Sequence, residues 1–531
     1  MKLKTTQTKL ILSVALFLAL FFNWTFFEKS LAIYPLDGGS AFFLSSMFVI
    51  LVSFINIVLS LFRSKYTTKF FLILILLLSS LAAYVMDSYG SILDEVMVLN
   101  ILHTDKNEAF DLFSFKLVLY FVFLGVIPSI LIYKTKLEVF SFKNEMFARG
   151  KSFLVSLTIV FVMLLSFGKN YATFFRQHRT LRSYTNPTFY IFSIGKFASL
   201  KLRSAKTQLV RIGETATIER SGELRNLVIF VVGETARRDR FSVNGYAKET
   251  NPLLKKEKII SFSNMTSCGT STAISVPCVF SHFGRGQFNS DKAATTENLL
   301  DILSHTKKVS VLWRDNNSNS KGVADRVTYE DFKNPPLNTI CDSECRDVGM
   351  LVGLQDYINK KKEGDLFIVL HQMGNHGPHY YKRYPTSYQV FKPVCLTNEL
   401  EKCTNEEINN AYDNAILYTD YFLSQVIDLL KQNSHVFGTS LFYVSDHGES
   451  LGENGVYLHG LPYFLAPDEQ KNIPAIMWFG GHTAKKIDYK ILQERSKMAF
   501  SHDNVFHTFL GLLDVKTPLY NKEMDILQGV L

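Results

Sequence analysis

Residues 264–272 read Asn-Met-Thr-Ser-Cys-Gly-Thr-Ser-Thr, and this stretch decides how the second half of the chain is interpreted. It places several hydroxyls in a glycine-containing turn directly after the apolar run 259–262, which is typical of a strand end. Two more strand-like runs end in metal-binding side chains: 231–235 reads Val-Val-Gly-Glu-Thr, and 443–448 reads Tyr-Val-Ser-Asp-His-Gly. A hydroxyl, a Glu and an Asp-His pair at strand ends can form a Zn²⁺ site around an activated nucleophile.

Strand-like runs alternate with amphipathic stretches from about Asn226 onward. The predicted strands are 227–232, 258–262, 309–313, 366–370, 441–444 and 476–479, and the predicted helices are 296–304, 348–360 and 406–432. This alternation predicts a largely parallel α/β sheet that helices cover on both faces. Open sheets of this kind bind ligands beyond the carboxyl ends of their strands, which is where the candidate residues lie.

Five apolar runs precede this region, and a bilayer-spanning helix takes roughly 20 apolar residues. They are 10–27, 41–62, 70–86, 115–133 and 153–167. A cleaved signal peptide is the alternative for the first run, but no small-residue cleavage site follows it cleanly, and four more runs do follow. We therefore predict a transmembrane domain of five helices over residues 1–168.

Basic residues fall in alternate loops of this N-terminal part. Lys and Arg are concentrated before the first run and in the loops at 63–69 and 134–151, whereas the loop at 94–111 is acidic. Because positive loops stay in the cytoplasm, the N-terminus lies inside and the chain beyond about residue 169 lies outside. The net charge of +9 is explained by basic residues that set the membrane topology and contact an anionic lipid surface, so no nucleic-acid partner is expected.

Residues 169–224 are predicted to bridge the membrane domain and an exported domain over 225–531. Aromatic and basic residues mix over 171–182, and an apolar stretch with flanking lysines follows over 189–202. This pattern favours helices that lie in the outer membrane–water interface, with an ordinary linker as the alternative.

All six cysteines lie in the part that is predicted to be exported. They form three pairs that are close in sequence: Cys268 and Cys278, Cys341 and Cys345, Cys395 and Cys403. An oxidising compartment favours small disulfide-closed loops of this kind. Free buried thiols are the alternative, and metal binding by the middle pair lacks a second pair of ligands.

Glu234 ends one predicted strand, and Asp446 and His447 end another. Each is common at a strand end when taken alone, but together they supply the O and N ligands that bind Zn²⁺ at about 2 Å. The candidate nucleophiles are Ser267, Thr270, Ser271 and Thr272. Thr270 is preferred because a glycine precedes it, and because a helix that starts there would offer N–H groups to an anion.

Further polar residues could bind a phosphoryl or an ammonium group. His376 and His459 lie in glycine-rich turns, where a satisfied surface histidine is the alternative, and Asn317 and Lys321 lie in a polar stretch that could equally be a solvated loop. On the membrane side, three polar residues are spaced four apart, so they would share one face of a helix, where a carboxylate could hold an ammonium group; an ordinary solvated helix face is the alternative. The three residues are Asn100, Thr104 and Glu108.

The motifs resemble those of the phosphoethanolamine transferases that modify lipid A, a family that includes the mobile colistin-resistance enzymes. The resemblance runs nearly end to end and is carried by five segments. They are 232–237 (Val-Gly-Glu-Thr-Ala-Arg), 266–272, 313–318 (Trp-Arg-Asp-Asn-Asn-Ser), 371–378 (His-Gln-Met-Gly-Asn-His-Gly-Pro) and 445–454 (Ser-Asp-His-Gly-Glu-Ser-Leu-Gly-Glu-Asn). It implies a five-helix membrane domain followed by an exported α/β domain of the alkaline-phosphatase/sulfatase type. The short stretch 341–345 departs from the family pattern at one rim of the site.

The resemblance also implies residue roles. Thr270 would be the nucleophile that becomes phosphoethanolamine-threonine and would hold one tight Zn²⁺ together with Glu234, Asp446 and His447. The remaining roles would be divided as follows: His376 and His459 bind substrate phosphate or a second Zn²⁺, Asn317 and Lys321 contact the phosphoethanolamine, and Asn100, Thr104 and Glu108 bind the ethanolamine head group.

The implied reaction moves phosphoethanolamine from phosphatidylethanolamine to a phosphate of lipid A. The expected location is the bacterial inner membrane, with the catalytic domain in the periplasm, and the expected state is a monomer. An added ammonium group lowers the negative charge of lipid A, so resistance to cationic peptides such as polymyxins would follow.

Other functions fit parts of the pattern. A sister enzyme would use the same donor with a lipopolysaccharide core sugar, another glycan or an exported protein as acceptor, and no motif decides between these acceptors. A sulfatase would need Cys or Ser followed by x-Pro-x-Arg, and the nearest string, 275–279 (Ser-Val-Pro-Cys-Val), has no Arg. Phosphoglycerol transfer is disfavoured by the polar face at 100–108, and a non-catalytic membrane sensor by the presence of every zinc residue.

Overall fold

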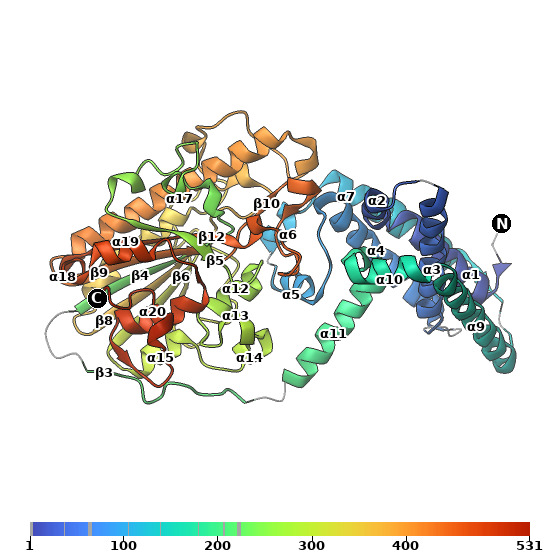
Figure 1. Ribbon diagram of the computed structural model, residues 1–531, viewed down its shortest axis with the longest axis horizontal. Helices are drawn as coiled ribbons and strands as arrows, with labels where there is room; N and C mark the ends of the chain where they lie inside the picture. Colours follow the sequence, from blue (N-terminus) through green and yellow to red (C-terminus); the bar gives the residue numbers. More distant parts are fainter. Residues whose placement is uncertain are drawn as a thin grey trace. The chain divides into compact units, whose positions relative to one another are not determined.

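A computed structural model describes residues 4–36, 38–61, 66–104, 106–138, 140–178, 180–204, 208–219 and 225–531 (Figure 1). The chain divides into two compact units. The helical unit comprises Met1–Val98 and Phe113–Ala198, and the sheet unit comprises Leu99–Leu112 and Ser199–Leu531. A short segment of the predicted membrane domain, Leu99–Leu112, therefore belongs to the sheet unit by its contacts.

Four helices of the described residues are long and apolar enough to cross a membrane. They are Ser40–Leu61 in α3 (Gly38–Leu61), α4 (Thr68–Tyr89), Phe115–Lys134, and Lys143–Ser166 in α9 (Phe142–Ser166). The third is continuous through α7 (Phe115–Leu119), a π-helical turn at Tyr120–Val126 and α8 (Ile127–Lys134). A bent pair, α1 (Gln7–Phe21) and α2 (Trp24–Ile33), makes a fifth span if the two are counted as one.

The predicted first span, 10–27, runs across the bend between α1 and α2. The two helices meet at an angle of 56°. At the break, the Asn23 amide donates to the carbonyls of Leu18 at 2.9 Å and Asn186 at 2.8 Å. The Leu18 carbonyl also accepts from Phe22 N at 3.1 Å, so the Asn23 side chain joins the last turn of α1 to the distant backbone of Asn186 at the point where the helix bends.

Two helices lie in the region predicted to bridge the domains. They are α10 (Gly168–Gln177) and α11 (Thr188–Ser204). On α10, Tyr171 and Phe174 are buried while Lys169 and Arg176 are exposed. This one-sided distribution is the amphipathic pattern expected of an interfacial helix.

The sheet unit is built on eight strands in the order β13-β5-β12-β9-β4-β8-β6-β7. Their bounds are β4 (Arg225–Gly233), β5 (Ile260–Thr266), β6 (Val309–Asp315), β7 (Thr328–Asp331), β8 (Asp365–His371), β9 (Phe437–Ser445), β12 (Asn472–Gly480) and β13 (Phe500–Ser501). Only β12 among them runs antiparallel to its neighbours, β5 and β9. The predicted largely parallel sheet is confirmed, and β4, β5, β6, β8 and β9 all end at the same edge.

Helices cover both faces of this sheet (Figure 1). Side chains of the central strand β4 alternate between two hydrophobic cores, as the two-residue repeat of a strand requires. Phe230 belongs to the core that includes residues of α12 (Thr272–Val279), α15 (Leu299–His305) and α20 (Asp503–Leu512). Ile229 belongs to the opposite core, with residues of α16 (Leu354–Lys360) and α17 (Asn405–Asn433). A strand buried on both faces holds its carboxyl end, and the residues that follow it, in a rigid frame.

Some predicted elements differ from the structure. The predicted helix 348–360 is a 3₁₀ turn over Asp347–Leu351 followed by α16, because Gly353 adopts a left-handed conformation with φ of 67° between them. Strands β7 and β13 were not predicted, since both are short. The remaining α-helices and strands of the described residues are β1 (Lys4–Thr5), β2 (Lys136–Leu137), α5 (Glu95–His103), α6 (Lys106–Asp111), β3 (Thr217–Ile218), α13 (Gly284–Gln287), α14 (Ser290–Ala294), β10 (Ser450–Leu451), β11 (Tyr457–Leu458), α18 (Gly481–Lys486), α19 (Tyr489–Arg495) and β14 (Val515–Lys516).

The six cysteines form three disulfides, each within a short loop. The bonds join Cys268 to Cys278, Cys341 to Cys345, and Cys395 to Cys403. The first connects the start of the β5–α12 turn, two residues after β5 ends, to α12 itself, so the hydroxyl-rich turn is held covalently against the helix that follows it.

Candidate metal centre and active site

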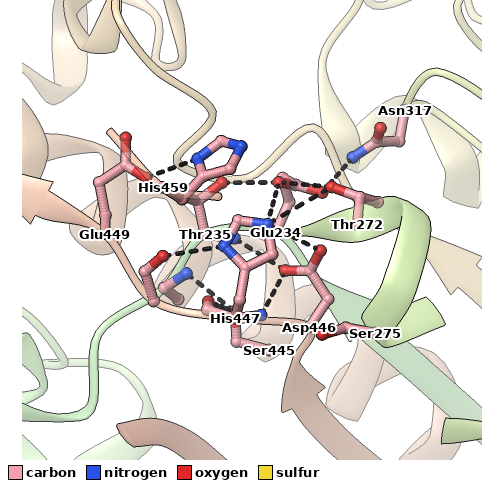
Figure 2. A network of polar contacts seen from close by, with 12 residues as sticks. Glu234, Thr235, Thr272, Ser275, Asn317, Ser445, Asp446, His447, Glu449 and His459 are labelled. Atoms are coloured by element: carbon pink, nitrogen blue, oxygen red, sulfur yellow. Dashed lines mark hydrogen bonds and ion pairs between the residues drawn. The ribbon is translucent and has the colours of Figure 1, made fainter. Parts of the chain in front are cut away.

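Two carboxylates and one imidazole meet at the carboxyl edge of the sheet (Figure 2). Glu234 follows β4, and Asp446 and His447 follow the adjacent strand β9. One ligand atom from each of the three lies within 4.8 Å of the others. All three residues are at most 2% exposed. The parallel pairing of β4 with β9 therefore brings together residues that are more than two hundred positions apart in the chain.

The hydroxyl at this cluster belongs to Thr272. Its Oγ1 donates to the two carboxylate oxygens of Glu234, at 3.2 and 3.3 Å, and lies 3.4 Å from Nε2 of His447. Figure 2 shows Thr272 pointing to Glu234 from the start of α12. Among the candidate hydroxyls of the β5–α12 turn, Thr272 is the one that these contacts place at the cluster.

The prediction that Thr270 supplies this hydroxyl is wrong. The Thr270 hydroxyl donates instead to the carbonyl of Leu461 at 2.6 Å, and the Thr270 carbonyl accepts from Gly460 N at 2.8 Å. The prediction assumed a helix that starts at Thr270, whereas Ser271 is the N-cap and α12 begins at Thr272. The hydroxyl in the first helical turn is thus shifted by two residues, and Thr270 ties the turn to the loop that carries His459.

Gly269 is required at this position for a reason other than the predicted approach of the backbone to a substrate. A Cβ on Gly269 would lie 2.6 Å from the side chain of Ile274, and Gly269 N donates to the Ser275 hydroxyl at 3.0 Å. The absence of a side chain is therefore required for the turn to pack against α12, rather than for approach to a substrate.

A strained turn orients the two carboxylates. Thr235, next to Glu234, has φ of 58°, which is costly for a β-branched residue. In this conformation its N–H donates to Asp446 Oδ1 at 3.0 Å, and its hydroxyl donates to Glu234 Oε1 at 2.7 Å. The Tyr412 hydroxyl donates to the Thr235 carbonyl at 2.6 Å and accepts from Arg237 N at 2.9 Å. Gly374 packs so closely that a Cβ there would lie 2.7 Å from the Glu234 carbonyl.

The imidazole of His447 is held in the form that binds a metal. Its Nδ1 donates to the Gly448 carbonyl at 2.8 Å, so the lone pair is on Nε2. Burial and the neighbouring His459 ring lower the pKa of His447 to about 3. Nε2 lies 3.3 Å from Asp446 Oδ2 and 3.5 Å from Glu234 Oε1, so the lone pair faces both carboxylates.

The donor set fits Zn²⁺. Burial raises the pKa of Asp446, because a carboxylate without a counter-charge is costly in the interior. Its Oδ2 is buried and has no hydrogen-bond partner among the described residues. Two carboxylate oxygens, one imidazole nitrogen and one hydroxyl are ligands that zinc accepts, and a divalent cation would compensate both carboxylates. Glu234, Asp446, His447 and Thr272 are therefore the residues that could hold the ion.

A second group lies beside the first. His459 Nδ1 lies 2.8 Å from Glu449 Oε2, and the His459 ring centroid lies 4.3 Å from that of His447 and 5.7 Å from that of His376. Burial opposes a charge on His459, but Glu449 raises its pKa to about 9, whereas burial lowers the pKa of His376 to about 4. One protonated and one neutral imidazole thus flank the cluster, next to a carboxylate, Glu449, that sequence reasoning missed.

Asn317 and Lys321 both lie near the turn after β6. The Asn317 amide donates to Glu234 Oε2 at 2.7 Å and to the Gln372 carbonyl at 2.8 Å, so it orients Glu234 directly. The Lys321 ammonium donates to the Ser318 hydroxyl at 2.5 Å.

A buried pair at the carboxyl ends of β6 and β8 was also missed. His371 Nδ1 lies 3.0 Å from Asp315 Oδ2, which also accepts from Trp313 Nε1 at 2.7 Å. Burial opposes a charge on His371, but Asp315 raises its pKa. Both residues end strands at the site edge, and this position was the available signal.

The predicted helical face on the membrane side is broken. Asn100 lies on α5, which ends at His103, and Thr104 follows in the gap before α6. The Thr104 hydroxyl donates to the Asn100 carbonyl, four residues earlier, at 2.8 Å. Glu108 lies on α6, but its side chain is outside the described part of the structure. The single helix predicted through these residues is therefore not continuous at Thr104, and the shared face stays a prediction.

Comparison with known proteins decides the family. A sulfatase family model matches residues 226–515, and a model described as phosphoethanolamine transferase EptA/EptB matches residues 51–202. The chain is 43% identical to phosphatidylethanolamine transferase Mcr-2 of Escherichia coli over 94% of each chain. It is 39% identical to phosphoethanolamine transferase EptA of Escherichia coli (strain K12), covering 98% of this chain and 96% of that protein. The chain belongs to the phosphoethanolamine transferase family.

Solved structures agree with this assignment. The full-length chain is similar to the integral membrane lipooligosaccharide phosphoethanolamine transferase A of Neisseria meningitidis, with a TM-score of 0.95, 35% identity and 99% of each chain covered. The soluble domain of that protein covers 61% of this chain with a TM-score of 0.59 and 41% identity. The predicted family and fold class are confirmed, and this transferase combines a membrane-integral part with an α/β domain.

Tyr412 offers a test of how this transferase holds its strained turn. Tyr412→Phe removes the hydroxyl that pairs with the Thr235 carbonyl and the Arg237 N–H, and leaves both buried groups unpaired. We expect a loss of about 1–3 kcal/mol in unfolding free energy, seen as a lower melting temperature. Tyr384→Phe is the matched control, because among the described residues its buried hydroxyl accepts a single, long contact of 3.4 Å from Asn414. Equal melting temperatures for both variants would contradict this role of Tyr412.

Proposed function

We propose that this protein transfers phosphoethanolamine from phosphatidylethanolamine to a phosphate of lipid A, through a covalent intermediate on Thr272. The observation that carries the proposal is the contact of the Thr272 hydroxyl with Glu234 and His447 at a site that fits Zn²⁺. The relatives support the chemistry: the protein at 43% identity is named a phosphatidylethanolamine transferase. The acceptor is suggested by the lipooligosaccharide in the name of the full-length structural relative.

The setting in the cell follows from the predicted topology. We propose that residues 1–168 anchor the chain in the bacterial inner membrane, that 169–224 lie at its outer surface, and that 225–531 act in the periplasm. The disulfides of the sheet unit suit that oxidising compartment. Both substrates are lipids, so membrane anchoring keeps the catalytic residues near them.

The first half-reaction forms a bond between Thr272 Oγ1 and phosphorus and breaks the bond from phosphorus to the diacylglycerol oxygen. The Thr272 hydroxyl donates to Glu234, so this carboxylate is placed to take its proton. When bound, Zn²⁺ would supply positive charge that favours the ionised hydroxyl and polarises the phosphoryl group. His459 is held protonated by Glu449 and could give a proton to the leaving diacylglycerol oxygen.

The second half-reaction reverses these roles. An oxygen of a lipid A phosphate attacks the phosphorus, the bond to Thr272 breaks, and the threonine oxygen regains its proton. The product carries an added ammonium group, which lowers the negative charge of lipid A. Weaker binding of cationic peptides such as polymyxins follows from that change in charge.

Mass spectra of lipid A test the proposed function. The full-length chain, expressed in a polymyxin-sensitive Gram-negative host, should add phosphoethanolamine to lipid A. Unmodified lipid A with the protein present in the membrane would contradict lipid A as the acceptor. In that case a core sugar, another glycan or an exported protein would have to be examined with the same donor.

Substitutions at the two threonines test the choice of nucleophile. Thr272→Ala should lower the transfer rate by more than about a thousandfold, as loss of a nucleophile does in other enzymes. Thr270→Ser keeps a hydroxyl for the bond to Leu461 and should retain most activity. Full activity of Thr272→Ala, at the same amount in the membrane as the wild type, would contradict Thr272 as the nucleophile.

Zinc content tests the ligand set. Asp446→Asn should lower the zinc that co-purifies with the full-length protein. Loss of a residue that merely hydrogen-bonds to a ligand already lowers metal affinity by about 10–100-fold, and loss of a ligand should lower it at least as much. Asp301→Asn is the matched control, since Asp301 is a similarly buried carboxylate that pairs with Arg326 instead. Equal zinc content in both variants, measured by atomic emission, would exclude Asp446 as a ligand.

A further inference from the structure

The segment Leu99–Leu112 lies between α4 and α7 along the chain, yet its contacts make it part of the sheet unit. It holds the end of α5, Thr104 and all of α6. Both of its ends continue along the chain into the helical unit. Contacts between this segment and the rest of the sheet unit must therefore offset the conformational entropy that is lost when an exposed loop becomes ordered.

Asp111, the last residue of α6, is the place where this binding is concentrated. Its carboxylate accepts from Arg383 Nη2 at 2.5 Å and from Lys382 Nζ at 2.8 Å, and lies 3.0 Å from His379 Nδ1. Its main-chain carbonyl accepts from the Asn398 amide at 2.9 Å. Asp111 is only 9% exposed. The carboxylate of Asp111 thus joins three side chains that follow β8, and its main-chain carbonyl joins a fourth.

Electrostatics keep this arrangement intact at neutral pH. Burial opposes the charge, but His379, Arg383 and Lys382 hold the pKa of Asp111 well below its usual range. A carboxylate with a depressed pKa stabilises the folded state above its unfolded pKa of about 4, and this stabilisation is lost only as the pH falls toward the folded value.

Arg383 connects Asp111 to the active site. Its side chain is 2% exposed, and its Nε donates to the His376 carbonyl at 2.5 Å. Its remaining nitrogen, Nη1, pairs with Glu344. One guanidinium therefore bridges the carboxylate of the inserted segment and the backbone of a histidine that flanks the proposed zinc cluster. Because the guanidinium is planar and rigid, a substitution at Asp111 that moves Arg383 would also shift the backbone of His376.

We propose that Asp111 is a positioning residue of this transferase. It holds Leu99–Leu112, with Asn100 and Thr104, on the sheet unit, and through Arg383 it sets the place of His376 beside the reacting phosphoryl group. The ammonium-bearing head group of the donor lipid is the substrate part that this arrangement would serve. The inference rests on the proposed function for its effect on catalysis, but not for its effect on the segment.

Asp111→Asn tests the proposal in the full-length protein, because it keeps the shape of the side chain and removes its charge. Hydrogen–deuterium exchange of peptides from 99–112 should speed up by at least about tenfold, since breaking one partner of a buried ion pair is strongly destabilising. The kcat/KM for phosphatidylethanolamine should fall by about tenfold or more, with the KM raised and the zinc content unchanged. A merely structural role would not raise the KM selectively.

Two further variants keep the test decisive. Asp301→Asn removes a buried carboxylate from its pair with Arg326 elsewhere in the sheet unit, and should leave exchange of 99–112 as in the wild type. If Asp111→Asn does not fold, Lys382→Met removes one partner whose side chain is 30% exposed, and should speed exchange of the same peptides by a smaller factor.

The proposal would be overturned if peptides from 99–112 exchanged in Asp111→Asn at the wild-type rate. If Asp111→Asn does not fold, a wild-type rate in Lys382→Met would have the same meaning. Faster exchange with an unchanged kcat/KM would also overturn it. A wild-type protein that transfers no phosphoethanolamine would instead count against the proposed function, and the exchange measurement would still decide whether Asp111 holds the segment.

Discussion

Two carboxylates are buried side by side at the edge of the sheet, and the rest of the site depends on how their charge is met. Glu234 and Asp446 come from adjacent parallel strands and are at most 2% exposed. Such a pair is unfavourable unless hydrogen bonds and a cation compensate it. Asn317, Thr235 and Thr272 all donate to Glu234, and the lone pair of His447 faces both carboxylates. This constraint explains both the strained turn at Thr235 and the proposed need for Zn²⁺.

The same constraint selects the nucleophile. A hydroxyl gains acidity only where positive charge can reach it, and Thr272 is the one that contacts the cluster. Thr270 is two residues away but bonds the loop that carries His459. The turn therefore has two different threonine roles, one chemical and one structural. Asp111 in the segment Leu99–Leu112 resembles Thr270 in this respect. Thr270 bonds to the loop that carries His459, and Asp111 pairs with Arg383, which bonds to the backbone of His376.

Sequence patterns were sufficient for the architecture and for most of the site. Apolar runs and strand-like runs predicted the membrane helices and the sheet, because both depend on local composition and periodicity. Glu234, Asp446 and His447 could be found because each directly follows a strong strand. The choice between Thr270 and Thr272 could not be made in this way, since it depends on the residue at which a short helix starts. Asp315 and Glu449 were missed because only the folded chain shows what they contact. The spacing of four residues did not reveal that α5 ends at His103.

The most direct test of the account is the position of the covalent intermediate. The wild-type protein would be incubated with phosphatidylethanolamine in the absence of an acceptor, quenched, reduced and digested, and the peptide that spans 264–279 would be fragmented in a mass spectrometer. The account predicts phosphoethanolamine on Thr272. An adduct on Thr270 or Ser271, or release of diacylglycerol with no adduct on this peptide, would contradict it.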